Sequence, residues 1–109
     1  MLPLSPENRK AYQAFRRHLK HKYGLSIDHF LAMYELQKGR CAICQVQLAV
    51  GAKSCHVDHC HETNSFRGIL CSRCNTGLGM FKDNENALLE AANYIVRHKM
   101  VIASVLKKR

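Results

Sequence analysis

Six cysteines occur in the chain, and four of them form two pairs with the spacing Cys-x-x-Cys: Cys41, Cys44, Cys71 and Cys74. Two residues between paired cysteines form a turn that brings both sulfurs onto one ion, and zinc prefers a tetrahedron of four thiolates. The spacing therefore predicts one structural Zn²⁺ site. A redox role for either pair is disfavoured because no βαβ pattern surrounds it.

Oxygen and nitrogen donors lie between and beside the cysteine pairs. Asp58 and His59 are adjacent between the pairs, and Asn75 follows the last cysteine directly. Hydrolysis of a phosphodiester needs a base that deprotonates water and a cation that neutralises the phosphate. His59 is the candidate general base, while the carboxylate of Asp58 and the carbonyl of Asn75 suit Mg²⁺ or Mn²⁺. These residues predict a metal-dependent phosphodiesterase.

Asp58 and His59 are neighbours on a predicted strand, and neighbouring side chains on a flat strand point to opposite faces. They can share one site only if the strand bends or ends there, and the sequence does not prove such a bend. Two alternatives stay open: Asp58 orients a histidine instead of binding a metal, or a histidine replaces one thiol at the zinc. The role of His56 is undecided, and Cys55 and Cys60 are expected to be buried free thiols.

The length of 109 residues fits one domain, for which a structural metal would supply much of the stability. The net charge is +9, and nucleic acid is the commonest partner of so basic a domain. The alternative is a generically basic surface. Six basic residues are candidates for contacts to the DNA backbone: Arg9, Arg16, Arg17, Lys20, Arg67 and Arg73. For Arg67, a structural role in bonding carbonyl groups near the hairpin is an equal alternative.

The cysteine pattern and the N-terminus indicate a reducing compartment. The first residues contain no charged start followed by an apolar run, and no segment has the 18 or so apolar residues that span a bilayer. Metal ligation is therefore a better explanation of the cysteines than a secreted disulfide scaffold. We expect a reduced cytoplasmic compartment, with no membrane association.

Helices are predicted at both ends of the chain. Ser5, followed by Pro6, favours the start of a basic helix that ends near Tyr23. Ser26 caps a second helix that runs to about Lys38. A third helix caps at Asp83 and continues through the apolar tail, 100–106. Apolar residues at helical spacing form a stripe on each, and the stripe on the last helix consists of Leu88, Ala91, Ala92 and Ile95.

Short strands and turns are predicted between these helices. Segments 47–50 and 53–58 suggest two strands joined at Gly51, and segment 67–71 suggests a third. A short helix from Ser72 or Cys74 to Leu78 follows, broken by Gly77 and Gly79. The predicted fold class is α+β. The single domain, 1–109, has N-terminal helices over 5–38, a zinc-bound core over 39–80 and a helical part over 83–109.

Three strings make the chain resemble a known family: QKGRCAIC at 37–44, VDHCH at 57–61 and RGILCSRCN at 67–75. They resemble the phage recombination endonuclease VII family of His-Me finger (HNH-like, ββα-metal) nucleases. The resemblance covers about 23–83. It implies a treble-clef core with a zinc on the four cysteines, His59 as general base, and Asp58 and Asn75 as ligands of the catalytic magnesium. His61 would contact the scissile phosphate or assist the base. The resemblance also implies that the cytoplasm is that of a bacterial or phage-infected host cell.

The sequence also departs from the family pattern. Members that resolve branched DNA carry an additional acidic residue on the helix after the Asn, whereas this helix reads TGLG at 76–79. Nicking or cleavage of duplex DNA is therefore a firmer expectation than junction resolution. The alternative function is a non-catalytic zinc-stabilised module that binds nucleic acid. A monomer would nick, whereas a homodimer would cleave both strands, and the sequence leaves both open.

Overall fold

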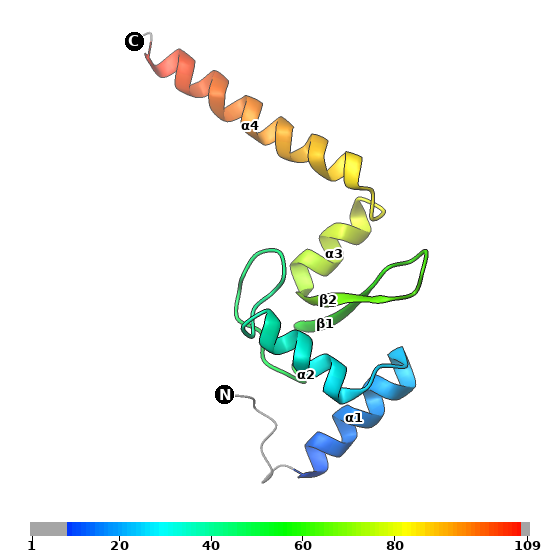
Figure 1. The fold of residues 1–109 in the computed structure, drawn as a ribbon. Coiled ribbons are helices and arrows are strands. Elements are labelled where there is room, and N and C mark those ends of the chain that lie inside the picture. The colour runs from blue at the N-terminus through cyan, green and yellow to red at the C-terminus, as the bar shows by residue number, and fades with distance from the viewer. Residues whose placement is uncertain (1–8, 108–109) are drawn as a thin grey trace. The chain divides into compact units, whose positions relative to one another are not determined.

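Four helices and one two-stranded sheet make up the part of the chain that the structure describes. This structure is a computed structural model, and it describes residues 9–107, with side chains up to residue 102. The elements follow the order α1 (Arg9–Tyr23), α2 (Ile27–Leu36), β1 (Cys55–His59), β2 (Phe66–Cys71), α3 (Ser72–Met80) and α4 (Glu85–Lys107) (Figure 1). The predicted α+β class is confirmed. The chain divides into two compact units, 1–76 and 77–109.

Helices α1 and α2 are joined by a tight turn. The predicted start of the first helix at Ser5 lies outside the described residues. The chain turns at Gly24, whose positive φ of 63° suits glycine. The hydroxyl of Ser26 accepts a hydrogen bond from the His29 N–H at 3.1 Å, so the predicted cap of α2 is confirmed. Helix α2 ends at Leu36, before the predicted end at Lys38, because Lys38 itself adopts a positive φ of 56°.

The apolar stripes of these two helices form part of the core, as predicted. Leu19 of α1 and Phe30 of α2 are fully buried. Phe15 packs edge-on against Phe30 with 5.1 Å between ring centroids, a favourable aromatic geometry. The core continues into the following segment through Leu48 and Ile69, which are also buried. Burial of these side chains holds the helical pair against the segment that carries the cysteines.

A glutamine side chain joins the end of α2 to β2. The Gln37 amide donates to the Ile69 carbonyl at 2.9 Å and to the Arg40 carbonyl at 2.7 Å. Its oxygen accepts from the Ile69 N–H at 2.9 Å. The side chain therefore pairs with Ile69 as a neighbouring strand would, and it satisfies the backbone of a fully buried residue. Its oxygen lies 3.0 Å from the position that a Cβ would occupy on Gly68.

Replacing Gln37 by alanine should lower the free energy of unfolding by about 2 kcal/mol, because the buried Ile69 N–H loses its acceptor and the Ile69 carbonyl loses one of its two donors. Denaturant unfolding followed by circular dichroism measures the change. Gln47→Ala is the matched control, since this side chain is exposed, and it should alter stability by less than about 0.5 kcal/mol. Equal effects of the two substitutions would contradict the role of Gln37.

Strands β1 and β2 pair antiparallel and form a hairpin (Figure 1). The predicted third strand is confirmed as β2, and the predicted strand over 53–58 begins later, at Cys55. The predicted strand over 47–50 is wrong: Gln47 forms only an isolated bridge with Arg40. The chain instead folds back on itself, since the Leu48 N–H donates to the Gly39 carbonyl at 2.8 Å. This return closes the turn that holds the first cysteine pair.

The hairpin contains an irregularity at one position. Asp58 pairs with Gly68, but the next residue, His59, pairs with Phe66. Arg67 is therefore an extra residue on β2 with no counterpart on β1. This is the geometry of a β-bulge, which bends the strand and re-aims the neighbouring side chains. The register shift falls between Asp58 and His59, the position at which a site shared by these two residues would require a bend.

Helix α3 follows directly from the end of β2. The predicted break at Gly77 and Gly79 is wrong, since the helix runs through both to Met80. A glycine inside a helix costs about 1 kcal/mol relative to alanine, which local hydrogen bonding can offset. The chain turns after Met80, where the Asp83 N–H donates to the Leu78 carbonyl at 2.8 Å.

Helix α4 begins later than predicted and is more exposed. Asp83 has a positive φ of 57°, which is incompatible with an N-cap. Asn84 is the cap instead, and its side chain accepts from the Ala87 N–H at 3.0 Å. The predicted buried stripe is wrong, because Ala92 and Ile95 are exposed. The predicted continuation through the tail is confirmed as far as Lys107. Among the described helices, none combines the length and apolarity needed to cross a bilayer.

Candidate metal centre and catalytic site

Two turns bring the four predicted cysteines together. The first pair lies in the turn after Arg40, where the Cys41 N–H donates to the Val46 carbonyl at 2.8 Å. The Ala42 N–H donates to the Ile69 carbonyl at 3.2 Å, which fixes this turn against β2. Cys71 is the last residue of β2, and Cys74 lies in the first turn of α3. The turn that carries the first cysteine pair, the hairpin β1–β2 and helix α3 thus follow one another in the order of a treble-clef fold.

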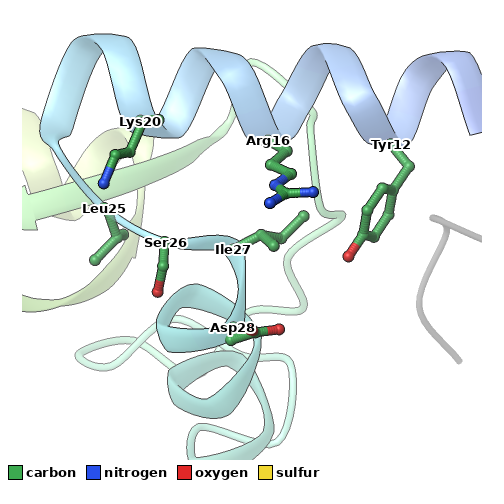
Figure 2. Close-up of a pocket in the computed structure, with 7 residues that line it drawn as sticks. All are labelled: Tyr12, Arg16, Lys20, Leu25, Ser26, Ile27 and Asp28. Carbon is green, nitrogen blue, oxygen red and sulfur yellow. The ribbon is translucent and has the colours of Figure 1, made fainter.

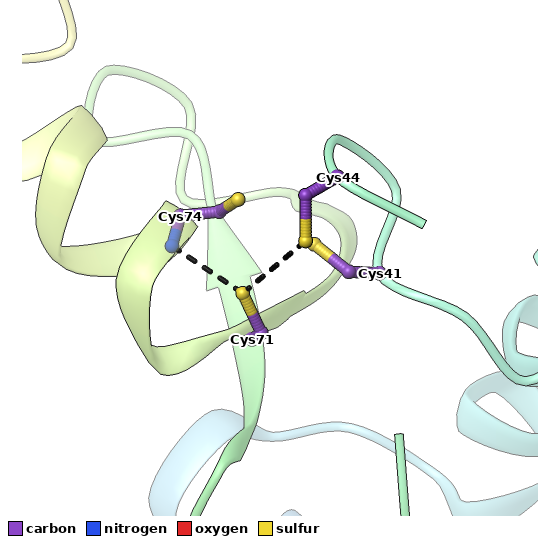
Figure 3. A group of neighbouring side chains, drawn as sticks. All are labelled: Cys41, Cys44, Cys71 and Cys74. Carbon is purple, nitrogen blue, oxygen red and sulfur yellow. Dashed lines mark hydrogen bonds between the residues drawn. The ribbon is translucent and has the colours of Figure 1, made fainter. Parts of the chain in front are cut away.

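The four sulfurs have the spacing of a tetrahedral zinc site. All lie within 4.8 Å of one another, and the sulfurs of Cys44 and Cys71 are 3.7 Å apart (Figure 3). Four thiolates at the usual zinc–sulfur bond length would be about 3.8 Å apart. The Cys74 N–H points at the Cys71 sulfur at 3.5 Å, the kind of contact that stabilises a thiolate. The cluster therefore fits Zn²⁺ in both donor type and geometry.

The thiols of the cluster differ in their tendency to ionise. Burial of the Cys41 thiol raises its pKa, but N–H groups of Cys71, Cys44 and Ile43 outweigh burial and lower the pKa to about 6. Burial, together with the neighbouring cysteine side chains, raises the pKa of Cys74 to about 12. A divalent cation would allow all four groups to become thiolates.

The remaining two cysteines are free and lie outside the cluster. Both are half-buried, whereas burial was expected. Cys55 lies opposite Cys71 in the register of the two strands. Burial raises the pKa of the Cys55 thiol to about 11. The Thr63 hydroxyl and the N–H groups of Thr63 and Glu62 lower the pKa of Cys60. Neither residue is needed to complete a tetrahedral site.

Asp58 forms an ion pair with the bulge residue. The Arg67 Nε donates to Asp58 Oδ2 at 2.7 Å, and Nη2 donates to Oδ1 at 3.2 Å. The side chain of Asp58 is 12% exposed and that of Arg67 is 36% exposed. Sequence reasoning assigned Arg67 to a phosphate or to carbonyl groups, and neither expectation included a carboxylate. No local pattern indicates this pair, because the register of the hairpin creates it.

His59 packs against an aromatic residue of α1. Its ring stacks on Tyr23 with 5.0 Å between centroids and an interplanar angle of 25°. His18 meets the same tyrosine edge-on at 6.1 Å, and the Lys22 ammonium lies 5.3 Å from its centroid. The sequence placed Tyr23 at the end of its predicted helix and gave no sign of contact with His59. The stack fixes the imidazole ring plane at the end of β1.

The start of α3 contacts the strand that carries Asp58. His56 Nε2 lies 3.0 Å from the Ser72 hydroxyl, and His56 shares a strand face with Asp58 two residues later. Asn75 lies one turn beyond Ser72, is half-buried, and forms no hydrogen bond through its side chain to any residue of 9–107. His61 is exposed in the turn after β1. The structure thus joins Asp58 to Arg67 and His59 to Tyr23.

The six predicted DNA contacts are all exposed. Arg16 and Lys20 line a hollow of about 320 Å³ between α1 and the start of α2 (Figure 2). Tyr12, Ser26 and Asp28 also line it. The two cations lie one helical turn apart on the same face of α1, as the figure shows. Two cationic side chains and one carboxylate, that of Asp28, thus line the hollow.

Fold and site define a small α+β protein of treble-clef architecture with a cluster of four cysteines that could hold a metal ion. The model of the recombination endonuclease VII family matches residues 16–97, and the chain belongs to this family. It is 40% identical over 74 residues to the "Gene 59 protein" of Mycobacterium phage D29, an alignment that covers 67% of this chain and 44% of the relative. A similar alignment with the "Gene 59 protein" of Mycobacterium phage L5 has 41% identity over 76 residues, and it covers 68% and 45%. The chain spans less than half the length of these curated relatives.

Proposed function

We propose that the chain is a metal-dependent DNA endonuclease of the HNH (His-Me finger) type, in which 1–109 act as one domain. The observation that carries this proposal is the bulge at Arg67, where the register shifts between Asp58 and His59. A bulge re-aims side chains next to it, which would let a carboxylate and an imidazole serve one substrate group, whereas neighbouring side chains on a flat strand point to opposite faces. Membership of the recombination endonuclease VII family supports the same activity.

We propose that the cysteine cluster holds a structural Zn²⁺ and that Asp58 and Asn75 hold a catalytic Mg²⁺ or Mn²⁺. Carboxylate and amide oxygens suit these hard cations. The hydrogen bond between His56 and Ser72 supports the pairing of the two ligands, because it brings the start of α3 to the strand face of Asp58. Ser72 and Asn75 share one face of α3, since they are three residues apart.

In the proposed mechanism, His59 accepts a proton from the attacking water. The stack on Tyr23 holds the imidazole in one orientation, so the base does not need to be ordered when the substrate binds. A bound divalent cation would neutralise charge on the phosphate and on the leaving oxygen. His61, exposed next to the strand end, would contact the scissile phosphate or assist the base. The products would carry 5′ phosphate and 3′ hydroxyl ends.

The basic residues supply the contacts that position the DNA. We propose that the hollow lined by Arg16 and Lys20 receives a backbone phosphate (Figure 2). Arg9, Arg17 and Arg73 are exposed and would add contacts that depend on salt but not on sequence. Both relatives are phage proteins, so we propose that the DNA is met inside an infected bacterial cell.

One observation favours the alternative, a zinc-stabilised module that binds nucleic acid without cleaving it. Both carboxylate oxygens of Asp58 are engaged by Arg67, as expected of a structural ion pair. The module would need the cysteines and the basic surface but neither His59 nor Asn75. The two functions differ in a direct assay of the DNA backbone.

Zinc-loaded protein should convert supercoiled plasmid to relaxed or linear DNA with Mg²⁺ and leave it intact without an added divalent cation. Asn75→Ala should reduce the Mg²⁺-dependent rate at least tenfold, since one metal ligand is lost. Gel electrophoresis of the plasmid measures both effects. Asn93→Ala, an exposed position on α4, is the matched control. Equal mobility shifts with intact plasmid under all conditions would support the binding module.

Replacing Tyr23 by alanine should lower kcat about tenfold with little change in KM for DNA, because the imidazole of His59 loses its stacking partner. Tyr23→Phe keeps the ring and should retain kcat within about twofold. Single-turnover cleavage of a labelled duplex separates the two parameters. If phenylalanine were as harmful as alanine, the hydroxyl rather than the stack would be important.

A further inference from the structure

The ion pair between Arg67 and Asp58 involves the residue at which the hairpin is irregular. Arg67 is the extra residue of the bulge, since Asp58 pairs with Gly68 and His59 pairs with Phe66. A regular hairpin has no place for such a residue. The bulge therefore sets the guanidinium beside the carboxylate that, in the proposed site, binds the catalytic cation.

The geometry of the pair occupies the carboxylate fully. Two N–H groups of one guanidinium reach the two different oxygens, at 2.7 and 3.2 Å. Such a forked contact is among the stronger hydrogen-bonded ion pairs, and it uses lone pairs that a metal ion also needs. With the Asp58 side chain only 12% exposed, little of the carboxylate is open to a second cation. A divalent ion and the guanidinium would also repel each other at such short range.

We infer, on the basis of the proposed cation site, that Arg67 is the exchangeable counter-ion of Asp58. The guanidinium holds the carboxylate when the divalent cation is unbound and is released when the cation binds. The Arg67 side chain is 36% exposed, so the released guanidinium reaches solvent and contacts a phosphate of the bound DNA. Metal binding and DNA binding are then coupled, each strengthening the other by the same factor.

A merely structural role for Arg67 predicts the opposite effect on metal binding. If the guanidinium served to orient Asp58 for the cation, its removal would weaken metal binding, as the loss of an outer-shell partner does. If it competes with the cation, its removal strengthens metal binding. The sign of the change therefore separates the two roles without any measurement of cleavage.

The first test measures Mn²⁺ binding to zinc-loaded protein in the absence of DNA, by electron paramagnetic resonance of free Mn²⁺. Arg67→Gln should tighten Mn²⁺ binding at least fivefold, and Arg67→Lys, which keeps the charge but not the fork, should give a smaller increase. Arg73→Gln is the matched control for a general change in charge and should stay within twofold of wild type. Zinc content and circular dichroism verify that each variant is folded.

Unchanged or weaker Mn²⁺ binding in both Arg67 variants, with the wild type binding one ion that Asp58→Asn abolishes, would overturn the exchange but leave the proposed nuclease intact. Absence of Mn²⁺ binding in the wild type would overturn both. If Arg73→Gln tightened Mn²⁺ binding as much as Arg67→Gln, the cause would be the general loss of positive charge. This result would also overturn the exchange.

The second test measures DNA binding in a His59→Ala background, in which cleavage does not interfere. Mn²⁺ should tighten binding of a short duplex at least fivefold. It should also steepen the dependence of the binding constant on salt concentration by the amount expected for about one phosphate contact. In the double variant His59→Ala/Arg67→Gln, both effects of Mn²⁺ should fall to less than half. Retention of the full salt effect without Arg67 would contradict its transfer to the phosphate.

Discussion

Replacing His59 by alanine should lower the Mg²⁺-dependent cleavage of DNA by about 10²- to 10⁴-fold, the usual contribution of a general base. The register of the hairpin shifts next to this residue, and the imidazole ring stacks on Tyr23. DNA affinity and zinc content should stay unchanged. Within residues 9–107, the imidazole of His59 stacks on Tyr23 and is not part of the cysteine cluster or of the exposed basic surface of α1. Single-turnover kinetics on a supercoiled plasmid would measure the loss.

The control for this substitution is His98→Ala, which removes an imidazole from an exposed position of α4. It should cleave at the wild-type rate. Activity of His59→Ala within about threefold of wild type would contradict the assignment of the base. Loss of DNA binding by the same variant would instead indicate a role in substrate contact.

Removing one zinc ligand should unfold the unit that contains the hairpin. Zinc binding to small cysteine sites contributes apparent free energies of about 10–16 kcal/mol, which exceeds the stability of most small domains. Cys41 is fully buried, so Cys41→Ser leaves a buried hydroxyl in place of a metal bond. The variant should lose the cooperative thermal transition in circular dichroism, and zinc per chain should fall from one to near zero by plasma mass spectrometry.

Cys60→Ser is the matched control because Cys60 is a free thiol outside the cluster. It should keep one zinc per chain and a melting temperature close to that of the wild type. A strong chelator added to wild-type protein should reproduce the unfolding of Cys41→Ser. A folded, zinc-loaded Cys41→Ser variant would contradict the proposed metal centre.

The cysteine cluster could be predicted because its information is local. Two residues between paired cysteines fix how the sulfurs converge, whatever the rest of the chain does. The same is true of the Ser26 cap, whose hydrogen bond spans three residues. The strand over 47–50 could not be excluded in this way, because strand formation depends on a partner. The backbone of Leu48 is bonded to Gly39 instead.

The candidate site was predictable in its residue types but not in its arrangement. Asp58 and His59 stood out by their chemistry, whereas the bulge opposite them depends on the register between two strands. The partners Arg67 and Tyr23 come from other elements, at sequence separations that no periodic pattern connects. For Arg67 the sequence indicated a positive charge but not the group that it contacts. Only the paired hairpin identifies that group as a carboxylate.

The bulge also determines which insertions and deletions the hairpin can tolerate during evolution. Loss of one residue from β2 between Phe66 and Gly68 would restore a regular ladder and would remove the arginine that pairs with Asp58. Such a gene could keep Asp58 and His59 unchanged and still encode a protein in which the carboxylate has lost its guanidinium partner. The connecting loop at 60–65 carries no such constraint on length. Variation in chain length among descendants should therefore accumulate in that loop and avoid the strands.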